Sequence, residues 1–155
     1  MPISLITANS QGGAPAFSAY LSGTQTISSG VWTKAQFATK EWDTANCFDS
    51  TTNYRFTPNV AGYYQINSQA DIYASGSSIT NSVISIYKNG TESKRGTLGS
   101  ITGTEYQSVV SAVIYLNGST DYIELYVNAT SGGTITLNGS AGKYGYFQAY
   151  FVRSA

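Results

Sequence analysis

The chain has 155 residues, enough for one domain with its own hydrophobic core. Eight Lys and Arg residues balance eight Asp and Glu residues, and charged residues make up only 10% of the chain. A nucleic-acid-binding protein needs a surplus of basic residues to displace counterions, so we expect no nucleic-acid partner. No apolar stretch approaches the ~20 residues of a membrane-spanning helix, and the first residues do not resemble a signal peptide, so we expect no membrane insertion.

The residue types that are missing exclude several kinds of catalytic and metal site. The chain has no histidine and one cysteine, Cys47, so it can form no Ser-His or Cys-His nucleophile pair, no histidine-based zinc site and no intrachain disulfide. Cys47 is interpreted as a small apolar side chain. Glu41 and Asp43, two residues apart, would share one face of a strand, but no other feature marks a cleft between them. We therefore expect neither an enzyme nor a cofactor or metal, with cleavage of a surface polysaccharide as the alternative.

In chain order, the pattern predicts a short linker and then a series of strands. Residues 1–15 have no sustained alternation and predict a linker or stalk connection before a domain at residues 16–153. From Ala16 onward, apolar and polar residues alternate with a period of two, and no segment has helical periodicity. The predicted strands cover residues 17–21, 63–72, 82–88, 109–116, 122–127, 135–137 and 146–152. Turn dipeptides such as Asn89-Gly90 and Asn117-Gly118 separate them, which predicts an all-β sandwich or jelly roll.

Three of these predicted strands carry apolar or aromatic residues on both faces. A two-layer sandwich buries only one face of each sheet, so the second apolar face predicts contact with another copy of the chain. The alternative is that these residues are ordinary surface aromatics. The residues predicted to form the contact between copies are Val83, Tyr87, Val113, Tyr115, Tyr146 and Tyr150.

Short motifs spread along residues 16–152 occur in the order of a known family. They include Ala16-Phe17-Ser18-Ala19, the segment Phe48–Phe56, Ile86-Tyr87-Lys88-Asn89-Gly90 and Phe147-Gln148-Ala149-Tyr150-Phe151. Together these motifs resemble the globular C1q/TNF-like domain family. The resemblance implies an all-β fold, a ten-stranded jelly-roll sandwich of two antiparallel sheets. It also implies assembly as a homotrimer, with both termini near the same end.

The chain departs from the family pattern in two places. Ser119 and Thr120 separate Gly118 from Asp121, where the family has Gly-Asp directly, so the calcium site of some relatives is not expected. No collagen-like Gly-x-y repeat precedes the domain. The many Ser, Thr, Asn, Gly and Tyr residues are similar to the versions found in bacteriophage tail fibres and bacterial surface proteins.

Aromatic residues and polar loops supply candidate contacts with a ligand. Tyr and Trp combine a large rigid surface with a polar group and can stack on sugars or protein epitopes. The candidate ligand contacts are Trp32, Trp42, Tyr106 and Tyr144, and the candidate contact loops are Ser75–Thr80, Thr97–Thr104 and Ser131–Gly133.

These features lead to a main functional hypothesis and one from another class. The first is a trimeric receptor-binding tip of a viral fibre, of the bacteriophage tail type, that attaches to a glycan or protein receptor on the host cell. It would lie on the virion surface, or alternatively be extracellular. The second is a structural trimerisation module of a fibre or bacterial surface protein that has no ligand of its own.

Overall fold

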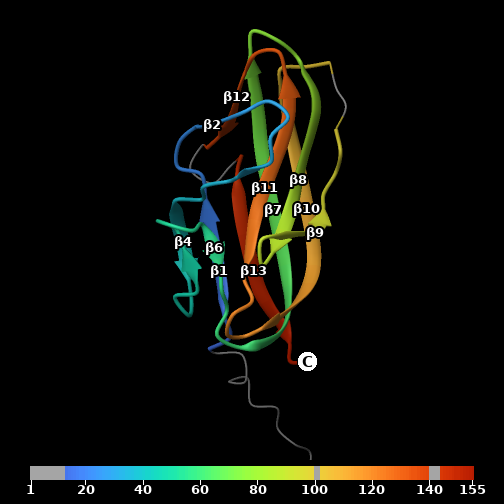
Figure 1. Ribbon diagram of the computed structural model, residues 1–155. Helices are drawn as coiled ribbons and strands as arrows, with labels where there is room; N and C mark the ends of the chain where they lie inside the picture. Colours follow the sequence, from blue (N-terminus) through green and yellow to red (C-terminus); the bar gives the residue numbers. More distant parts are fainter. Residues whose placement is uncertain (1–12, 100–101, 140–143) are drawn as a thin grey trace, which may run out of the picture.

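A computed structural model describes residues 13–99, 102–139 and 144–155. Within these ranges the chain forms thirteen β-strands and no helix, and therefore no apolar helix that could span a membrane. The strands form two antiparallel sheets packed face to face (Figure 1). The predicted all-β sandwich is confirmed, and a strand lies in each of the seven predicted regions.

Sheet A is organised around one long central strand, β7, which is hydrogen-bonded on both edges. Strand β10 pairs along one edge of β7, while β13 and then β12 pair in succession along the other. Beyond β13 lie β1 and β4, and beyond β12 lies β2. The seven strands are β1 (Ala16–Tyr20), β2 (Gln25–Ile27), β4 (Thr39–Asp43), β7 (Ala61–Ser75), β10 (Glu105–Asn117), β12 (Thr134–Asn138) and β13 (Tyr146–Arg153).

Sheet B has the order β5-β6-β11-β8-β9, with β3 also paired to β11. The structure has thirteen strands, whereas the resemblance implied ten. Three of the thirteen, β3, β5 and β6, have only two residues each. The six strands of sheet B are β3 (Thr33–Lys34), β5 (Phe48–Asp49), β6 (Arg55–Phe56), β8 (Ile79–Lys88), β9 (Thr91–Arg95) and β11 (Ile123–Ser131).

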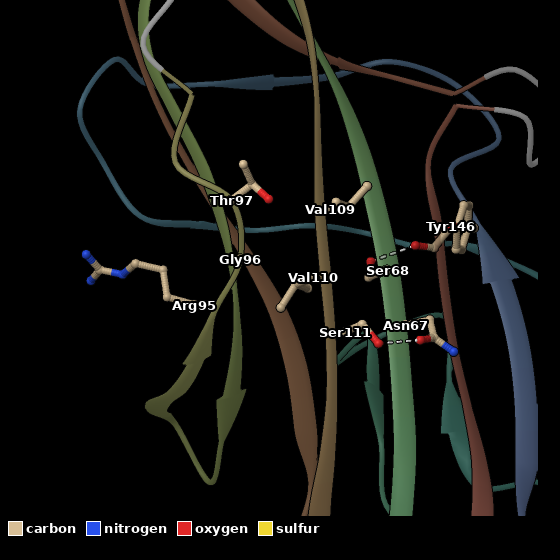
Figure 2. Close-up of a pocket in the computed structure, with 9 residues that line it drawn as sticks. All are labelled: Asn67, Ser68, Arg95, Gly96, Thr97, Val109, Val110, Ser111 and Tyr146. Carbon is tan, nitrogen blue, oxygen red and sulfur yellow. Dashed lines mark hydrogen bonds between the residues drawn. The ribbon is translucent and has the colours of Figure 1, made fainter.

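A short extended segment, residues 96–99, links the two sheets along one side. The Gly96 amide donates to the Ile84 carbonyl of β8, and the Thr97 amide donates to the Val109 carbonyl of β10. Figure 2 shows Gly96 and Thr97 beside β10. A Cβ atom on Gly96 would overlap the Val109 carbonyl oxygen, so this close approach requires glycine.

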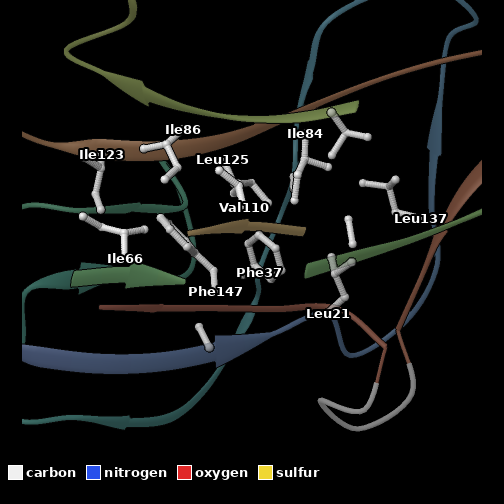
Figure 3. Close-up of a cluster of buried hydrophobic side chains, with 14 of the residues drawn as sticks. Leu21, Phe37, Ile66, Ile84, Ile86, Val110, Ile123, Leu125, Leu137 and Phe147 are labelled. Atoms are coloured by element: carbon white, nitrogen blue, oxygen red, sulfur yellow. The ribbon is translucent and has the colours of Figure 1, made fainter. Parts of the chain in front are cut away.

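The core lies between the sheets and confirms the predicted alternation (Figure 3). Along β7, the side chains of Tyr64, Ile66 and Ile72 are fully buried, whereas Gln65, Asn67 and Gln69 point to the opposite face and are half-buried. The Phe17 ring stacks on Phe48 at a centroid distance of 4.4 Å and meets Phe147 edge-on at 5.1 Å. Cys47 is buried at the edge of this core, as expected, and burial raises the pKa of its thiol.

Candidate functional site

The face of sheet A that is turned away from sheet B is called here the outer face. Cross-strand partners place its side chains in rows that run across β10, β7, β13 and β1. None of the residues in the three middle rows is charged. These rows are Val113, Gln65, Tyr150 and Ala16; Ser111, Asn67, Gln148 and Ser18; and Val109, Gln69, Tyr146 and Tyr20.

Large apolar side chains on the outer face are unusually open to solvent. Val109, Val113, Tyr115 and Tyr150 each have between 40% and 51% of their surface exposed. Tyr63 and Tyr115 pack edge to face in the row closest to the C-terminus, where Arg153 lies over the Tyr63 ring. Depletion of charge together with enrichment of aromatic residues is typical of the core of a protein–protein interface.

The middle row of the outer face forms a polar stripe with its own hydrogen bonds. Gln65 of the adjacent row donates through Nε2 to Ser111 Oγ, and Ser111 Oγ donates to Asn67 Oδ1, each at 2.8 Å. Farther along the row, Gln148 Nε2 donates to Ser18 Oγ, which donates to Glu41 Oε2. Because these groups bond to one another within the chain, covering the stripe would leave few polar groups unsatisfied.

The structure divides the six predicted contact residues into two groups. Val113, Tyr115, Tyr146 and Tyr150 lie together on the outer face of sheet A. Val83 and Tyr87 lie in β8 of sheet B, so the six residues do not share one face. Val83 is also only 4% exposed within a single chain, which leaves it little surface for another copy.

A local aromatic cluster explains why β8 is apolar on both faces. The Tyr87 ring stacks on Tyr126 of the neighbouring strand at 4.1 Å, and Trp32 packs against Tyr87 at 5.9 Å. The Arg95 guanidinium lies 5.5 Å from the Trp32 ring centre and binds Glu92 through two short hydrogen bonds. This ion pair lowers the pKa of Glu92. The second face of β8 is therefore covered partly by the chain itself.

The four candidate ligand contacts do not form one site. Trp32 belongs to the cluster on sheet B, and Tyr106 is half-buried, packed against the core and close to Gly99. Trp42 lies opposite Ser18 at the β4 edge of the outer face and is 48% exposed. Tyr144 is exposed just before β13. Of the four, Trp42 and Tyr144 are the exposed ones, and Tyr106 is less exposed than expected.

Parts of the three candidate loops meet at the end of the molecule opposite to the start of β1 and the C-terminus (Figure 1). The Ile79 amide donates to the Gly103 carbonyl at 2.7 Å, and Ser131 Oγ donates to the Ser77 carbonyl at 3.4 Å. Ser29, which the sequence analysis missed, donates to the Ser131 carbonyl at 2.9 Å. These segments, residues 28–30, 75–80, 102–104 and 131–133, are called here the apical loops. They are uncharged and rich in Ser, Thr and Gly.

Thr97–Gly99, the first part of the middle predicted loop, does not reach the apical end. It runs alongside β8 and β10 instead. Residues 100 and 101 of the same predicted loop lie outside the described residues.

The two carboxylates considered for catalysis do not face one another. A bulge in β4 inserts Glu41 between Lys40 and Trp42, so Glu41 reaches Ser18 on the outer face. The Asp43 carboxylate instead accepts hydrogen bonds from the backbone amides of Cys47 and Phe48, both at 2.9 Å. The expectation that the pair shares a strand face is therefore wrong. Within residues 13–99, 102–139 and 144–155, no group of three or more His, Cys, Asp or Glu side chains could hold a metal ion.

Comparison with solved structures identifies the architecture. The Eiger TNF of S. frugiperda superposes with a TM-score of 0.60 at 13% identity, covering 92% of this chain and 93% of that one. The globular domain of zebrafish complement 1qA gives a TM-score of 0.62 at 14% identity, covering 91% of this chain and 99% of that one. The chain has a C1q/TNF-like jelly-roll fold. Murine APRIL, at pH 5.0, matches this fold with a TM-score of 0.61 at 11% identity, covering 90% of this chain and 99% of that one.

Sequence comparisons find no counterpart to these structural matches. No family model matches the C1q/TNF-like domain described here, and no curated protein matches its sequence. At 11–14% identity the structural likeness concerns the fold alone, so functional inference depends on the surfaces of this chain.

Proposed function

We propose that this C1q/TNF-like domain is a homotrimeric receptor-binding module, the tip of a viral fibre of the bacteriophage tail type. The observation that carries the proposal is the outer face of sheet A, which is uncharged in its three middle rows and exposes Val109, Val113 and Tyr150. Absence of charge together with several exposed apolar and aromatic side chains on one face is typical of the core of a protein–protein interface, so another copy of the chain is the simplest cover. The proposal that the assembly contains three copies is based on the resemblance to the C1q/TNF-like family.

The position of the apical loops supports a binding role. The start of β1 and the C-terminus lie at one end of the sandwich, and the apical loops lie at the other (Figure 1). Three copies arranged side by side would present three sets of apical loops in the same direction. Weak contacts made by each set would then add up to useful avidity for a repeated surface ligand. The hydroxyl-rich apical loops suit a glycan or a polar protein receptor, on the virion surface or in another extracellular setting.

The second candidate is a structural trimerisation module without a ligand. The uncharged outer face supports this candidate equally, because both candidates assemble through it. The two differ in the apical loops, which bind a receptor in the first candidate and bind nothing in the second. Binding assays therefore decide between the two candidates, while the assembly state tests both.

The test combines light scattering with binding of the purified chain to a panel of bacterial cells and to a glycan array. We expect a trimer that binds at least one surface, and we expect Thr102→Arg, in the apical loops, to weaken that binding. Thr120→Arg, which changes an exposed residue at the opposite end, is the matched control and should bind normally. A trimer that binds no surface would favour the structural module, whereas a chain that stays monomeric would contradict both candidates.

A further inference from the structure

The outer face has a hollow at one edge and an exposed tryptophan at the other. The hollow has a volume of about 490 Å³, within the range of about 300–1,000 Å³ that accommodates small organic ligands. It lies beside β10, and its lining includes Asn67, Val109 and Ser111 (Figure 2). Trp42 projects from β4 at the far edge and is 48% exposed.

The tryptophan and the hollow lie at the same level along the strands. Trp42 is opposite Ser18, and Ser18 is opposite Gln148. Gln148 is in turn opposite Asn67, which is opposite Ser111 in the wall of the hollow. One row of cross-strand partners therefore connects the two features across the whole sheet.

This arrangement has a direct consequence for a ring of identical copies. In such a ring, one patch of each copy meets a different patch of the next copy. If the symmetry axis runs along the strands, the two patches must lie at the same height and on opposite edges. Trp42 and the hollow satisfy both conditions.

The chemistry of the two features is also complementary. The hollow combines an apolar wall at Val109 with hydroxyl and amide groups from Ser111 and Asn67. An indole ring needs apolar contact for its faces and a polar partner for its N–H group, and this lining offers both.

We propose that Trp42 of one copy inserts into the hollow beside β10 of the next copy, forming a head-to-tail contact that closes the ring. This inference rests on the proposed self-association and specifies which two patches meet. It assigns Trp42 to the contact between copies instead of to a receptor. The occupant of the hollow is thus a defined side chain of a second copy of this chain.

The first experiment measures assembly by light scattering over a dilution series. Trp42→Ala removes the inserted ring, and Ser111→Trp fills the hollow from its own side. Each should raise the concentration at which half of the chains are assembled by roughly 30-fold or more, the effect typical of an interface hot spot. Val31→Ala, which shortens an exposed apolar side chain away from the outer face, should change it less than about threefold. Circular dichroism of every variant checks that the fold is retained.

The second experiment follows Trp42 directly. Trp32→Phe leaves Trp42 as the only tryptophan, because the chain contains two. Its emission should shift to shorter wavelength as the chain assembles and return on dilution. An emission maximum that does not change with assembly would overturn the inference. A shift of the Trp42 emission on addition of a glycan, with no change in assembly, would also overturn it, because Trp42 would then contact the glycan.

The outcomes separate this inference from the proposed function. If the unmodified chain is a trimer and both variants assemble as readily as the control, the Trp42 contact is wrong while the proposed self-association stands. If the unmodified chain remains monomeric at every concentration, the proposed self-association and the Trp42 contact are both wrong. Selective loss of assembly in Trp42→Ala and Ser111→Trp would support the inference.

Discussion

Phe147 occupies the position where the aromatic rings of both sheets meet. It is fully buried, and its ring centre lies 5.1 Å from that of Phe17, 5.6 Å from Phe37 and 6.0 Å from Phe48. Phe147→Ala would leave a cavity that these rings cannot fill, and we expect the free energy of unfolding to fall by about 3–5 kcal/mol. Urea unfolding measures the change. Val31→Ala on the surface should alter stability by no more than about 0.5 kcal/mol, and equal effects of the two substitutions would contradict the assignment of Phe147 to the core.

Asp49 organises a turn through its carboxylate and makes stability depend on pH. Its Oδ1 atom accepts hydrogen bonds from the backbone amides of Thr51 and Thr52, both at 2.9 Å, and these bonds hold the pKa of Asp49 well below its usual range. A carboxyl whose pKa is lower in the folded state stabilises the fold above its unfolded pKa of about 3.9. This stabilisation is lost progressively as the pH falls below that value.

Asp49→Asn should therefore lower the melting temperature at pH 7, where the carboxylate is charged. The difference from the unmodified chain should narrow as the pH falls from 5 to 2, because the Asp49 carboxyl of the unfolded chain is protonated in this range and must lose its proton when the chain folds. Thermal unfolding monitored by circular dichroism at several pH values provides the measurement. A difference that is the same at pH 7 and pH 2 would show that the negative charge is not what stabilises the turn.

At the scale of elements, Gly118 fixes the connection between β10 and β11 by its lack of a side chain. Its φ is +71°, and a Cβ atom would overlap the backbone of Val60 and Ala61 at the start of β7. Gly30 is a matched control, because its φ is +74° and a Cβ atom there would meet nothing within 4 Å.

Two single variants, Gly30→Ala and Gly118→Ala, distinguish backbone strain from steric overlap. Gly30→Ala should destabilise the fold by about 1–2 kcal/mol, the penalty of a left-handed conformation. Gly118→Ala should destabilise it by more, since the backbone of β7 must also move. Chemical denaturation of the two variants measures the difference, and similar values would mean that the β10–β11 connection adapts without strain.

The strands that sequence analysis identified have at least one face lined by buried apolar residues. In β7 and β11, apolar residues such as Ile66 and Leu125 alternate with polar ones, and this period of two specifies a strand. The missed strands are short or polar: β2, β3, β5 and β6 have two or three residues each, and most residues of β4 and all of β9 are exposed. They are held by pairing with a neighbouring strand, so their own residues carry little signal.

The candidate site was only partly predictable, because alternation does not reveal which sheet a strand joins. The pattern of β8 resembles that of β10, yet Tyr87 faces Trp32 on sheet B whereas Val113 is open on sheet A. The contact between Trp32 and Tyr87 joins positions 55 residues apart, and only the folded chain brings them together. The pairings of β7 with β10 and β13 determine which side chains share the outer face, and these pairings cannot be read from the alternation of residues.

For the whole molecule, the proposed self-association depends on keeping the outer face uncharged. Tyr150 lies in a middle row of that face and is 51% exposed. Tyr150→Asp would place a charge in the contact between copies, where it would be desolvated without a partner, so we expect assembly to weaken by at least tenfold. Light scattering measures assembly. Thr120→Asp, at an exposed position outside the outer face, should assemble normally, and a Tyr150→Asp variant that assembles equally well would contradict the use of this face.

The central place of β7 has a consequence for how the chain reaches its native state. Its partners β10, β12 and β13 all come later in the sequence, and β10 and β13 begin 30 and 71 residues after β7 ends. Such distant pairings require large loops to close before they contribute stability, which makes folding slow. Once formed, the amides of β7 should be among the last to exchange with solvent. During synthesis, this strand would have to wait for the end of the chain to complete its pairing.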